Sequence, residues 1–421
     1  MNIQLRSRKP VWILLLLLLG GLLHAQGDWE AGVPLNTPRY GATSVVLNGY
    51  IYVLGGARNT NLILNTVERY NPQTKSWEDT IVPNFVQPRL DAAAIVFDGK
   101  IYLTGGRNSQ GDITDEVEIY DPGSNAWSSG ERMNRERRGH SAVILNGSIC
   151  VMGGFREGTD YVDEIEWFDY YGSGEWEKAD TDIVSPRSNM FAAAVNNRFY
   201  MFGGIAVVPI SSAYDATLQA GWSFNWGTLL GLPVARGNGA TASAGNLIFI
   251  IGGITNSGST DRFDIYNTQT GQFQNATPFP AARTGMSAVT LDDSIFVIGG
   301  YDSNPDQPTA AVEKYPLPIV GISPVEQLPV SFAQINGYPN PFNGTIQLAI
   351  DLPAGGVNEL TIYDLQGRKL RTLHRGHLGA GRHMFRWNAE DDAGRPAASG
   401  VYVAVLKGKQ HLRQFRIVYV K

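Results

Sequence analysis

The stretch "NGYIYVLGGARN" (48–59) decides the fold, because an apolar run that ends in two glycines recurs five more times. The other copies are "DGKIYLTGGRN" (98–108), "NGSICVMGGFRE" (146–157), "NNRFYMFGGIA" (196–206), "GNLIFIIGGIT" (245–255) and "DDSIFVIGGYD" (292–302). The first glycines stand at 55, 105, 153, 203, 252 and 299, at intervals of 50, 48, 50, 49 and 47. Each run is apolar at successive positions, which predicts a strand buried on both faces. A closed ring of stacked sheets buries both faces of every copy.

Further phrases outside the glycines carry a family resemblance. "VERYNPQTKSW" (67–77) and "VEIYDPGSNAW" (117–127) resemble kelch repeats closely, and "IEWFDYYGSGEW" (165–176) and "FDIYNTQTGQF" (263–273) resemble them loosely. In kelch proteins each repeat of this length forms one four-stranded blade of a β-propeller. The resemblance covers residues 28–315 and implies an all-β fold, with a six-bladed kelch β-propeller in that range.

The first and last repeats predict how the ring closes. The sixth copy stops after "AVEKY" (311–315), without the tryptophan that ends the outer strand elsewhere. The chain after its leader begins with "WEAGVPLNTPR" (29–39), which parallels "WEDTIVPNFVQPR" (77–89). We therefore expect residues 28–35 to supply the outer strand of the last blade.

The N-terminal 25 residues have the pattern of a signal peptide. Arg6, Arg8 and Lys9 precede "VWILLLLLLGGLL" (11–23), and a small residue, Ala25, follows at a position suited to cleavage. The apolar run is shorter than the ~20 residues that a membrane span needs. We expect export with no membrane span after signal removal; the alternative is an uncleaved anchor.

Composition excludes several classes of protein. Charged residues make up 17% of the 421 residues and there are 48 glycines, which favours short strands and tight turns over helices. Residues 28–337 carry 19 Lys and Arg against 33 Asp and Glu, so an acidic body argues against nucleic-acid binding. The single cysteine, Cys150, excludes an intrachain disulfide and lies in an apolar run, where a buried thiol is expected.

An arginine stands at the start of every repeat. These residues are Arg39, Arg89, Arg137, Arg187, Arg236 and Arg283. Because strands alternate in direction, the loop that enters the innermost strand and the loop after Gly-Gly open on one face, so the six arginines should ring the channel mouth. The ring is either an anion site or, as perfect recurrence favours, a set of bonds to loop carbonyls and acidic side chains.

Positions on that face that differ between repeats are the candidates for ligand binding. They are Tyr40, Arg58, Asp91, Arg107, Arg138, Arg156, Asn189, Asn238, Tyr301 and Asp302. Taken singly, each is also explained as a solvated loop residue. Together they suggest a basic mouth that recognises an anionic or hydroxyl-rich ligand, such as a carboxylate-bearing glycan or an acidic peptide.

We predict no catalytic residue, no cofactor and no metal site. The copper-radical oxidases with kelch rings need two histidines, two tyrosines and a crosslinked cysteine, whereas His140 is the only histidine in residues 28–315. The exported kelch sialic-acid mutarotases match only in the repeat. A carbohydrate-active enzyme of the epimerase, mutarotase or lyase type remains the alternative function. In the irregular fourth repeat, Trp222, Phe224 and Trp226 either form a ligand-stacking lip or pack in the blade.

The C-terminal part has its own pattern. A proline-rich stretch (316–337) reads as a linker, and six strand candidates at 345–351, 358–364, 368–374, 382–387, 400–407 and 411–419 suit a small sandwich. "YPNPFN" (338–343), "IYDLQGR" (362–368) and "AGRHMFRWNAEDDAGRPAASGVYV" (380–403) are similar to the C-terminal sorting domains of the type IX secretion system, of the FlgD-like immunoglobulin-fold type.

The resemblance of residues 338–421 implies contact with the type IX machinery and delivery outside a Gram-negative cell, either secreted or held on the outer-membrane surface. An ordinary accessory sandwich is the alternative. The sequence thus predicts an exported propeller that binds a surface glycan or protein ligand noncovalently through its Gly-Gly-loop face.

Overall fold

The structure is a computed structural model, and it describes residues 28–158, 160–170, 172–317, 334–338, 342–352, 356–364, 368–379, 381–408 and 412–420. The predicted signal peptide (1–25) lies outside these residues. Among them, no helix is long and apolar enough to cross a membrane.

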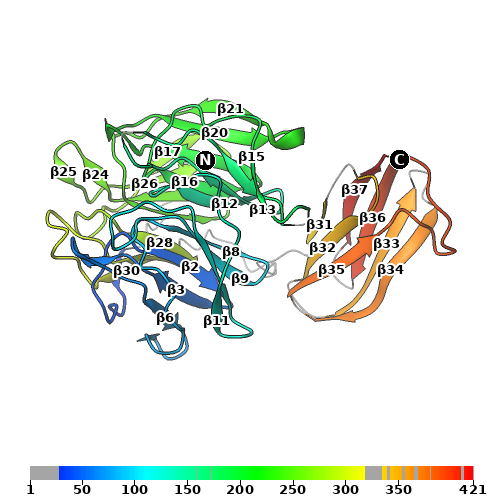
Figure 1. The fold of residues 1–421 in the computed structure, drawn as a ribbon, viewed down its shortest axis with the longest axis horizontal. Coiled ribbons are helices and arrows are strands. Elements are labelled where there is room, and N and C mark those ends of the chain that lie inside the picture. Colours follow the sequence, from blue (N-terminus) through cyan, green and yellow to red (C-terminus); the bar gives the residue numbers. More distant parts are fainter. Residues whose placement is uncertain are drawn as a thin grey trace, which may run out of the picture.

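The N-terminal unit, coloured blue to yellow in Figure 1, consists of six four-stranded antiparallel sheets, one for each repeat. From the innermost strand outward, blade 1 contains β2 (Thr43–Leu47), β3 (Tyr50–Leu54), β6 (Val67–Asn71) and β7 (Ser76–Glu78). Blade 2 contains β8 (Ala93–Phe97), β9 (Lys100–Thr104), β10 (Val117–Asp121) and β11 (Ala126–Ser129). Blade 3 contains β12 (Ser141–Leu145), β13 (Ser148–Met152), β14 (Glu166–Phe168) and β15 (Trp176–Lys178). Blade 4 contains β16 (Phe191–Val195), β17 (Arg198–Phe202), β20 (Ala213–Leu218) and β21 (Phe224–Leu229). Blade 5 contains β22 (Ala240–Ala244), β23 (Leu247–Ile251), β26 (Phe263–Asn267) and β27 (Gln272–Asn275). Blade 6 contains β28 (Ser287–Leu291), β29 (Ser294–Ile298), β30 (Val312–Pro316) and β1 (Glu30–Ala31). The innermost strands β2, β8, β12, β16, β22 and β28 adjoin one another in a closed cycle, so the sheets form a six-bladed propeller.

The second strand of each blade is the repeated apolar run, and it is buried on both faces. In β13 all five side chains are buried, and in the other five blades the last four are. Neighbouring blades cover the two faces, which explains why successive positions, rather than alternate ones, are apolar.

The paired glycines connect each blade to the next. The N–H of the second glycine donates to the carbonyl of the next repeat's arginine, as in Gly106 N to Arg137 O at 2.9 Å, and all six pairs make this bond. A Cβ on the first glycine would meet that same carbonyl, for example at 2.4 Å from Gly105. The pair recurs because a side chain there would push adjoining blades apart.

The N-terminal residues complete the sixth blade. Strand β1 pairs with β30 on its outer edge, and Trp29 packs edge-on or tilted against Phe263, Phe279 and Tyr315, with ring centroids 4.9–5.1 Å apart. Its indole N–H donates to Thr277 O at 3.2 Å. One sheet therefore combines strands from the two ends of the repeat region, which leaves the ring without an unpaired gap.

Short hairpins extend the loops that follow Gly-Gly in three blades. They are β4 (Ala57–Asn59) with β5 (Leu62–Ile63), β18 (Ile205–Ala206) with β19 (Val208–Pro209), and β24 (Ile254–Thr255) with β25 (Gly258–Ser259). A 3-10 turn, η1 (Ala220–Trp222), precedes the outer strand of blade 4. We call the side of the propeller that carries the Gly-Gly loops the mouth face.

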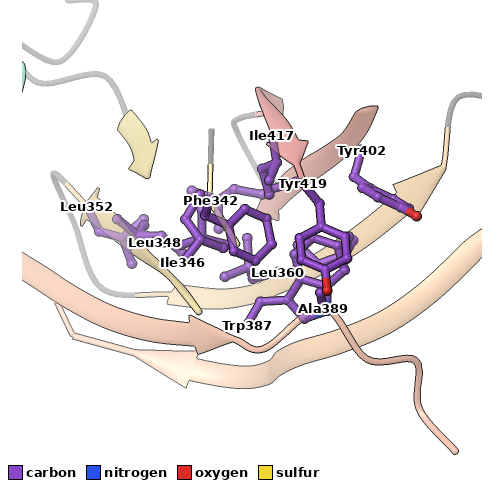
Figure 2. Packing of buried hydrophobic residues seen from close by; sticks show 14 residues of the cluster. Phe342, Ile346, Leu348, Leu352, Leu360, Trp387, Ala389, Tyr402, Ile417 and Tyr419 are labelled. Atoms are coloured by element: carbon purple, nitrogen blue, oxygen red, sulfur yellow. The ribbon is translucent and has the colours of Figure 1, made fainter. Parts of the chain in front are cut away.

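The C-terminal unit is a sandwich of two antiparallel sheets. One contains β31 (Gln334–Tyr338), β32 (Ile346–Leu352) and β35 (Gly381–Trp387); the other contains β34 (Lys369–Leu378), β33 (Gly356–Asp364), β36 (Gly400–Gly408) and β37 (Leu412–Tyr419). Figure 2 shows Phe342 of the "YPNPFN" phrase within the core, where its ring lies 4.9 Å from Tyr419 and 5.6 Å from Trp387. Phe342 thus packs between the two sheets.

The boundary between the units differs from the sequence prediction in one respect. Strand β31 begins at Gln334, inside the stretch predicted as linker (316–337), because it pairs with β32 along its whole length. The first residue of that stretch, Pro316, ends β30, and residues 318–333 lie outside the described residues.

Candidate functional site at the mouth of the propeller

The six repeat arginines are buried beneath the mouth face, with exposed fractions of 0–4%. Five donate to the carbonyl of the first glycine of their own blade, as Arg137 Nη1 does to Gly153 O at 3.0 Å. Their guanidinium groups therefore join the strands of a blade and offer no open surface to a ligand.

In five blades a carboxylate forms an ion pair with the buried arginine. The partners are Glu68, Glu118, Glu166, Asp264 and Glu313, each on the third strand of its blade. All five occupy one register position, opposite the residue two before the first glycine. The sequence shows this acid in "VERY", "VEIY", "IEWF", "FDIY" and "VEKY", but its role was missed because sequence alone does not say which acids face inward.

Blade 4 departs from this pattern. Tyr214 stands opposite Met201, where the other blades have their acid, and the guanidinium of Arg187 lies over its ring at 5.4 Å from the centroid. Arg187 instead donates to Ser212 O at 2.9 Å and to Ser212 Oγ at 3.0 Å. Burial lowers the pKa of Arg187 to about 10, because no carboxylate among the described residues compensates its desolvation.

A closed circle of backbone hydrogen bonds narrows the channel at the mouth. Its members, one per blade, are Gly41, Asp91, Gly139, Asn189, Asn238 and Gly285. Each N–H donates to the carbonyl of the preceding member at 2.7–2.9 Å, and all six have φ between 49° and 65°. Left-handed backbone favours Gly, Asn and Asp, so this conformation accounts for the residue types at three of the candidate positions.

The circle borders a cavity of about 220 Å³ in the central channel. Its wall comes from the circle and from the small residues that follow it in the innermost strands, among them Ser44, Ser141 and Thr241. Asp91, Asn189 and Asn238 are the circle members with polar side chains that line this space, and they come from three different blades. The repeat thus positions polar groups around the axis both from the circle and from the innermost strands.

Five candidate residues form one cluster on the mouth face, called the mouth cluster: Tyr40, Asp91, Arg107, Arg138 and Tyr301. Arg138 Nη1 lies 3.0 Å from Asp91 Oδ2, and the rings of Tyr40 and Tyr301 meet edge-on at 5.0 Å between centroids. Burial raises the pKa of Asp91, while the charges of Arg138 and Arg107 oppose this rise. Burial also raises the pKa of both tyrosines, and the Asp91 charge adds to this.

Arg107 is the least satisfied member of the mouth cluster. Among the described residues it makes no ion pair, and its Nε is buried without a hydrogen-bond partner. Its backbone is held on both sides, by bridges to Leu90 and to Ile113. Two guanidinium groups around one carboxylate leave the cluster with an excess of one positive charge.

The remaining candidates do not join the mouth cluster. Arg156 pairs with Asp160 at 3.1 Å in its own loop, and Arg58 and Asp302 are exposed. Because Arg138 and Arg156 both have carboxylate partners, the mouth is less basic than the arginine count suggests. Asp306, which no sequence pattern singled out, accepts bonds from Thr60 N and Oγ1, both at 2.7 Å.

The aromatic residues of blade 4 lie in the outer part of the propeller. Trp222 stacks flat on Trp167 with centroids 4.1 Å apart, Phe224 is buried, and the Trp226 indole N–H donates to Asp182 O at 3.1 Å. They pack in the core between blades 3 and 4 and form no lip. Cys150 is buried and burial raises the pKa of its thiol; the described residues contain no cluster of three potential metal ligands from His, Cys, Asp and Glu.

His140 follows the circle in blade 3 and is buried against Gly105 of blade 2. Its Nε2 lies 2.9 Å from Thr104 Oγ1, and its Nδ1 has no partner in the part of the chain that the structure describes. The residue that directly follows the circle member is Met190 in blade 4 and Met286 in blade 6. Burial, and then the charge of Arg137, hold the pKa of His140 well below its usual value, so the folded ring stays neutral.

We expect His140→Met to remove part of the acid sensitivity of folding. A group whose folded pKa is depressed takes up its proton in the unfolded chain first, so its stabilisation is lost as pH falls through about 6.5. Between pH 7.5 and 5.5 this amounts to at most about 1.4 kcal/mol, which the variant should not lose. Urea unfolding at the two pH values checks this, and an equal pH dependence in both proteins would contradict it.

Comparisons with known proteins agree with this architecture. The KLHDC2/KLHL20/DRC7 Kelch-repeats domain matches residues 129–300, the Kelch motif matches 38–79 and 88–134, and the FlgD Ig-like domain matches 338–411. The solved structure titled "Structure of YjhT" is similar with a TM-score of 0.58 and 16% identity, over 67% of this chain and 95% of that one. At that identity the likeness concerns the fold alone.

Curated relatives match over short stretches. Kelch-like protein 40 of Xenopus laevis is 35% identical over 79 residues, 18% of this chain and 13% of the relative. Kelch-like protein 35 of Mus musculus is 30% identical over 80 residues, and Kelch-like protein 33 of Homo sapiens is 42% identical over 53 residues, covering 19% and 13% of this chain and 14% and 10% of those proteins. The chain therefore carries Kelch repeats folded as a six-bladed β-propeller, followed by a domain similar to the FlgD Ig-like domain.

Proposed function

We propose that the propeller binds an anionic ligand, a glycan or a protein, noncovalently through the mouth cluster. The observation that carries this proposal is Arg107, whose backbone is held by two bridges and whose guanidinium has no ion pair among the described residues, beside the Asp91–Arg138 pair. A carboxylate placed against the partly exposed guanidinium of Arg107 would give it an ion-pair partner and neutralise the excess charge. Charge-assisted hydrogen bonds of this kind are the strongest that a side chain makes.

The residues around Arg107 favour specific recognition of a ligand over nonspecific electrostatic attraction. Tyr40 is buried and Tyr301 is half-buried, and their rings pack edge-on against each other. Partial burial weakens screening by salt, so one excess charge acts more strongly here than on an open surface. Polar groups of the circle, Asn189 and Asn238, could extend the contacts to hydroxyl groups of a larger ligand.

We expect Arg107→Ala to raise the dissociation constant for an acidic ligand by about 10–100-fold, because a hydrogen bond to a charged group contributes about 1.5–3 kcal/mol. The measurement is fluorescence polarisation with the full chain, against acidic peptides and uronic- or sialic-acid oligosaccharides. Arg132→Ala is the matched control, since this exposed arginine is already paired with Asp115 and Glu116. Equal affinity of the wild-type and Arg107→Ala proteins for every bound ligand would refute the proposal.

One observation favours a carbohydrate-active enzyme as second candidate. Asp91 combines a raised pKa with a position beside Tyr40, which is an arrangement suited to proton transfer. Asp91→Asn keeps a residue type that the circle already uses in blades 4 and 5, so the variant should fold. Turnover of a sugar that this change abolishes would favour the enzyme, whereas saturable binding without turnover would favour the binding module.

We further propose that the chain is exported, with removal of residues 1–25, and is released or held at the surface of a Gram-negative cell by a type IX route that acts on residues 338–421. The match of 338–411 to the FlgD Ig-like domain and the independent core of the sandwich support this. A reporter fused to residues 316–421 should leave a host with type IX secretion, and retention of the reporter in the periplasm would count against the sorting role.

A further inference from the structure

An aliphatic hairpin tip stands on the mouth face of blade 4. Strands β18 and β19 pair Ala206 with Val208, which leaves Val207 at the tip with an exposed fraction of 87% and φ of 71°. Val208 is 51% exposed. A β-branched residue at positive φ is a steric outlier, because its branched Cβ crowds the backbone.

The corresponding loops of the other blades have polar tips. They read "RNTN" (58–61), "NSQG" (108–111), "REG" (156–158), "TNSG" (255–258) and "SNPD" (303–306), against "AVVP" (206–209) in blade 4. Asparagine or glycine would fit the turn better and would not expose apolar surface. Local folding therefore disfavours Val207, and a departure of this kind is expected where a residue serves a contact outside the fold.

A chain of contacts connects this tip to the mouth cluster. The N–H of Val207 donates to the Tyr161 hydroxyl at 2.7 Å, and the Tyr161 ring meets Phe155 edge-on at 5.6 Å. The guanidinium of Arg138 lies over Phe155 at 5.3 Å from the ring centroid. We call Arg138, Phe155, Tyr161, Val207 and Val208 the valine strip; it runs from a cationic inner end to an aliphatic outer end.

We propose that the valine strip binds a protein segment that carries a carboxylate at its inner end and an apolar side chain at its outer end. The excess positive charge of Arg107 and Arg138 over Asp91 complements the carboxylate. Val207 and Val208 offer apolar area but no open aromatic ring face, which suits an aliphatic or aromatic side chain better than the hydroxylated surface of a sugar. This inference rests on the proposed function, since it names the ligand class of the same face.

The test compares the wild-type full chain with a double variant of its aliphatic tip. Val207→Asn with Val208→Thr removes the apolar tip and places at Val207 a residue that accepts positive φ, so the fold should not be weakened. The probe is a peptide array in which Asp or Glu is separated from Leu, Ile or Phe by spacers of different length, with Ser replacing the apolar residue in matched peptides. We expect the wild-type protein to prefer the apolar peptides, and the double variant to lose at least about tenfold in affinity.

Val86→Asn is the control, because Val86 is 70% exposed in the propeller but is not part of the valine strip. This variant should bind as the wild type does. If acidic peptides bind through Arg107 but the double valine variant binds them equally well, the inference is wrong while the proposed function stands. Binding of oligosaccharides alone would also overturn it, and binding of neither class would overturn both.

Discussion

Glu166→Ala will lower the free energy of unfolding by about 3–5 kcal/mol, because it leaves the cation of Arg137 buried without its counterion. The side chains of Arg137 and Glu166 are 0% and 1% exposed. Glu166 also accepts a hydrogen bond from the backbone N–H of Asn134, so the substitution leaves a second donor without its acceptor. Chemical denaturation followed by tryptophan fluorescence reports mainly on the propeller, which holds seven of the eight tryptophans after residue 27.

Glu164→Ala is the matched control for this experiment. Glu164 pairs with Arg135, whose side chain is 48% exposed, and such pairs contribute about 0–1 kcal/mol. The Glu164 carbonyl continues to accept from Arg137 in this variant. Replacing both Arg137 and Glu166 by methionine should recover much of the loss, since no charge then remains unpaired. A loss below 1 kcal/mol for Glu166→Ala would mean that the buried pairs do not hold the blades.

Gly105→Ala should be comparably destabilising, by about 2–5 kcal/mol, for two reasons that add. Gly105 has φ of 59°, where an L-residue is disfavoured by about 1–2 kcal/mol. Its new Cβ would also lie 2.4 Å from Arg137 O and 2.8 Å from His140 Cε1, and such overpacking costs about 1–3 kcal/mol. The clash falls on the backbone of the next blade, which cannot move without opening the ring.

Gly99→Ala separates the two contributions. Gly99 lies in the turn between β8 and β9 of the same blade with φ of 72°, and no atom of the described residues stands within 4 Å of the place that a Cβ would take there. This variant should lose about 1–2 kcal/mol, from the backbone conformation only. If both alanine variants were equally stable, close approach of the blades would not be the reason for the paired glycines.

The fold was predictable because a propeller repeats its signal. The six apolar runs, the Gly-Gly pairs and the aromatic phrases each meet a structural requirement that is the same in every blade. The same sequence pattern therefore occurs six times in one chain. The pattern of the tail likewise indicated a sandwich. Strand β31 was missed because "QINGY" (334–338) has no alternating pattern and follows a proline-rich stretch; only its pairing with β32 makes it a strand.

The candidate site was less predictable, because the sequence does not show whether the partner of a charged residue lies in its own loop, in another loop or nowhere nearby. Arg107, Arg138 and Arg156 look alike in the sequence, yet Arg138 meets Asp91 from blade 2, Arg156 meets Asp160 in its own loop, and Arg107 has no ion pair among the described residues. The circle of backbone bonds was also not foreseen, although the Gly, Asn and Asp residues at its positions were a signal for left-handed backbone.

By itself, the sequence determined the number of blades and the face that varies between them, because backbone sterics and strand burial impose the same residues at the same spacing. The tertiary structure alone decided which arginines are neutralised, where Val207 stands relative to the mouth, and that Tyr214 replaces the acid of blade 4. Those properties depend on distances between residues of different loops and strands, which no local pattern encodes.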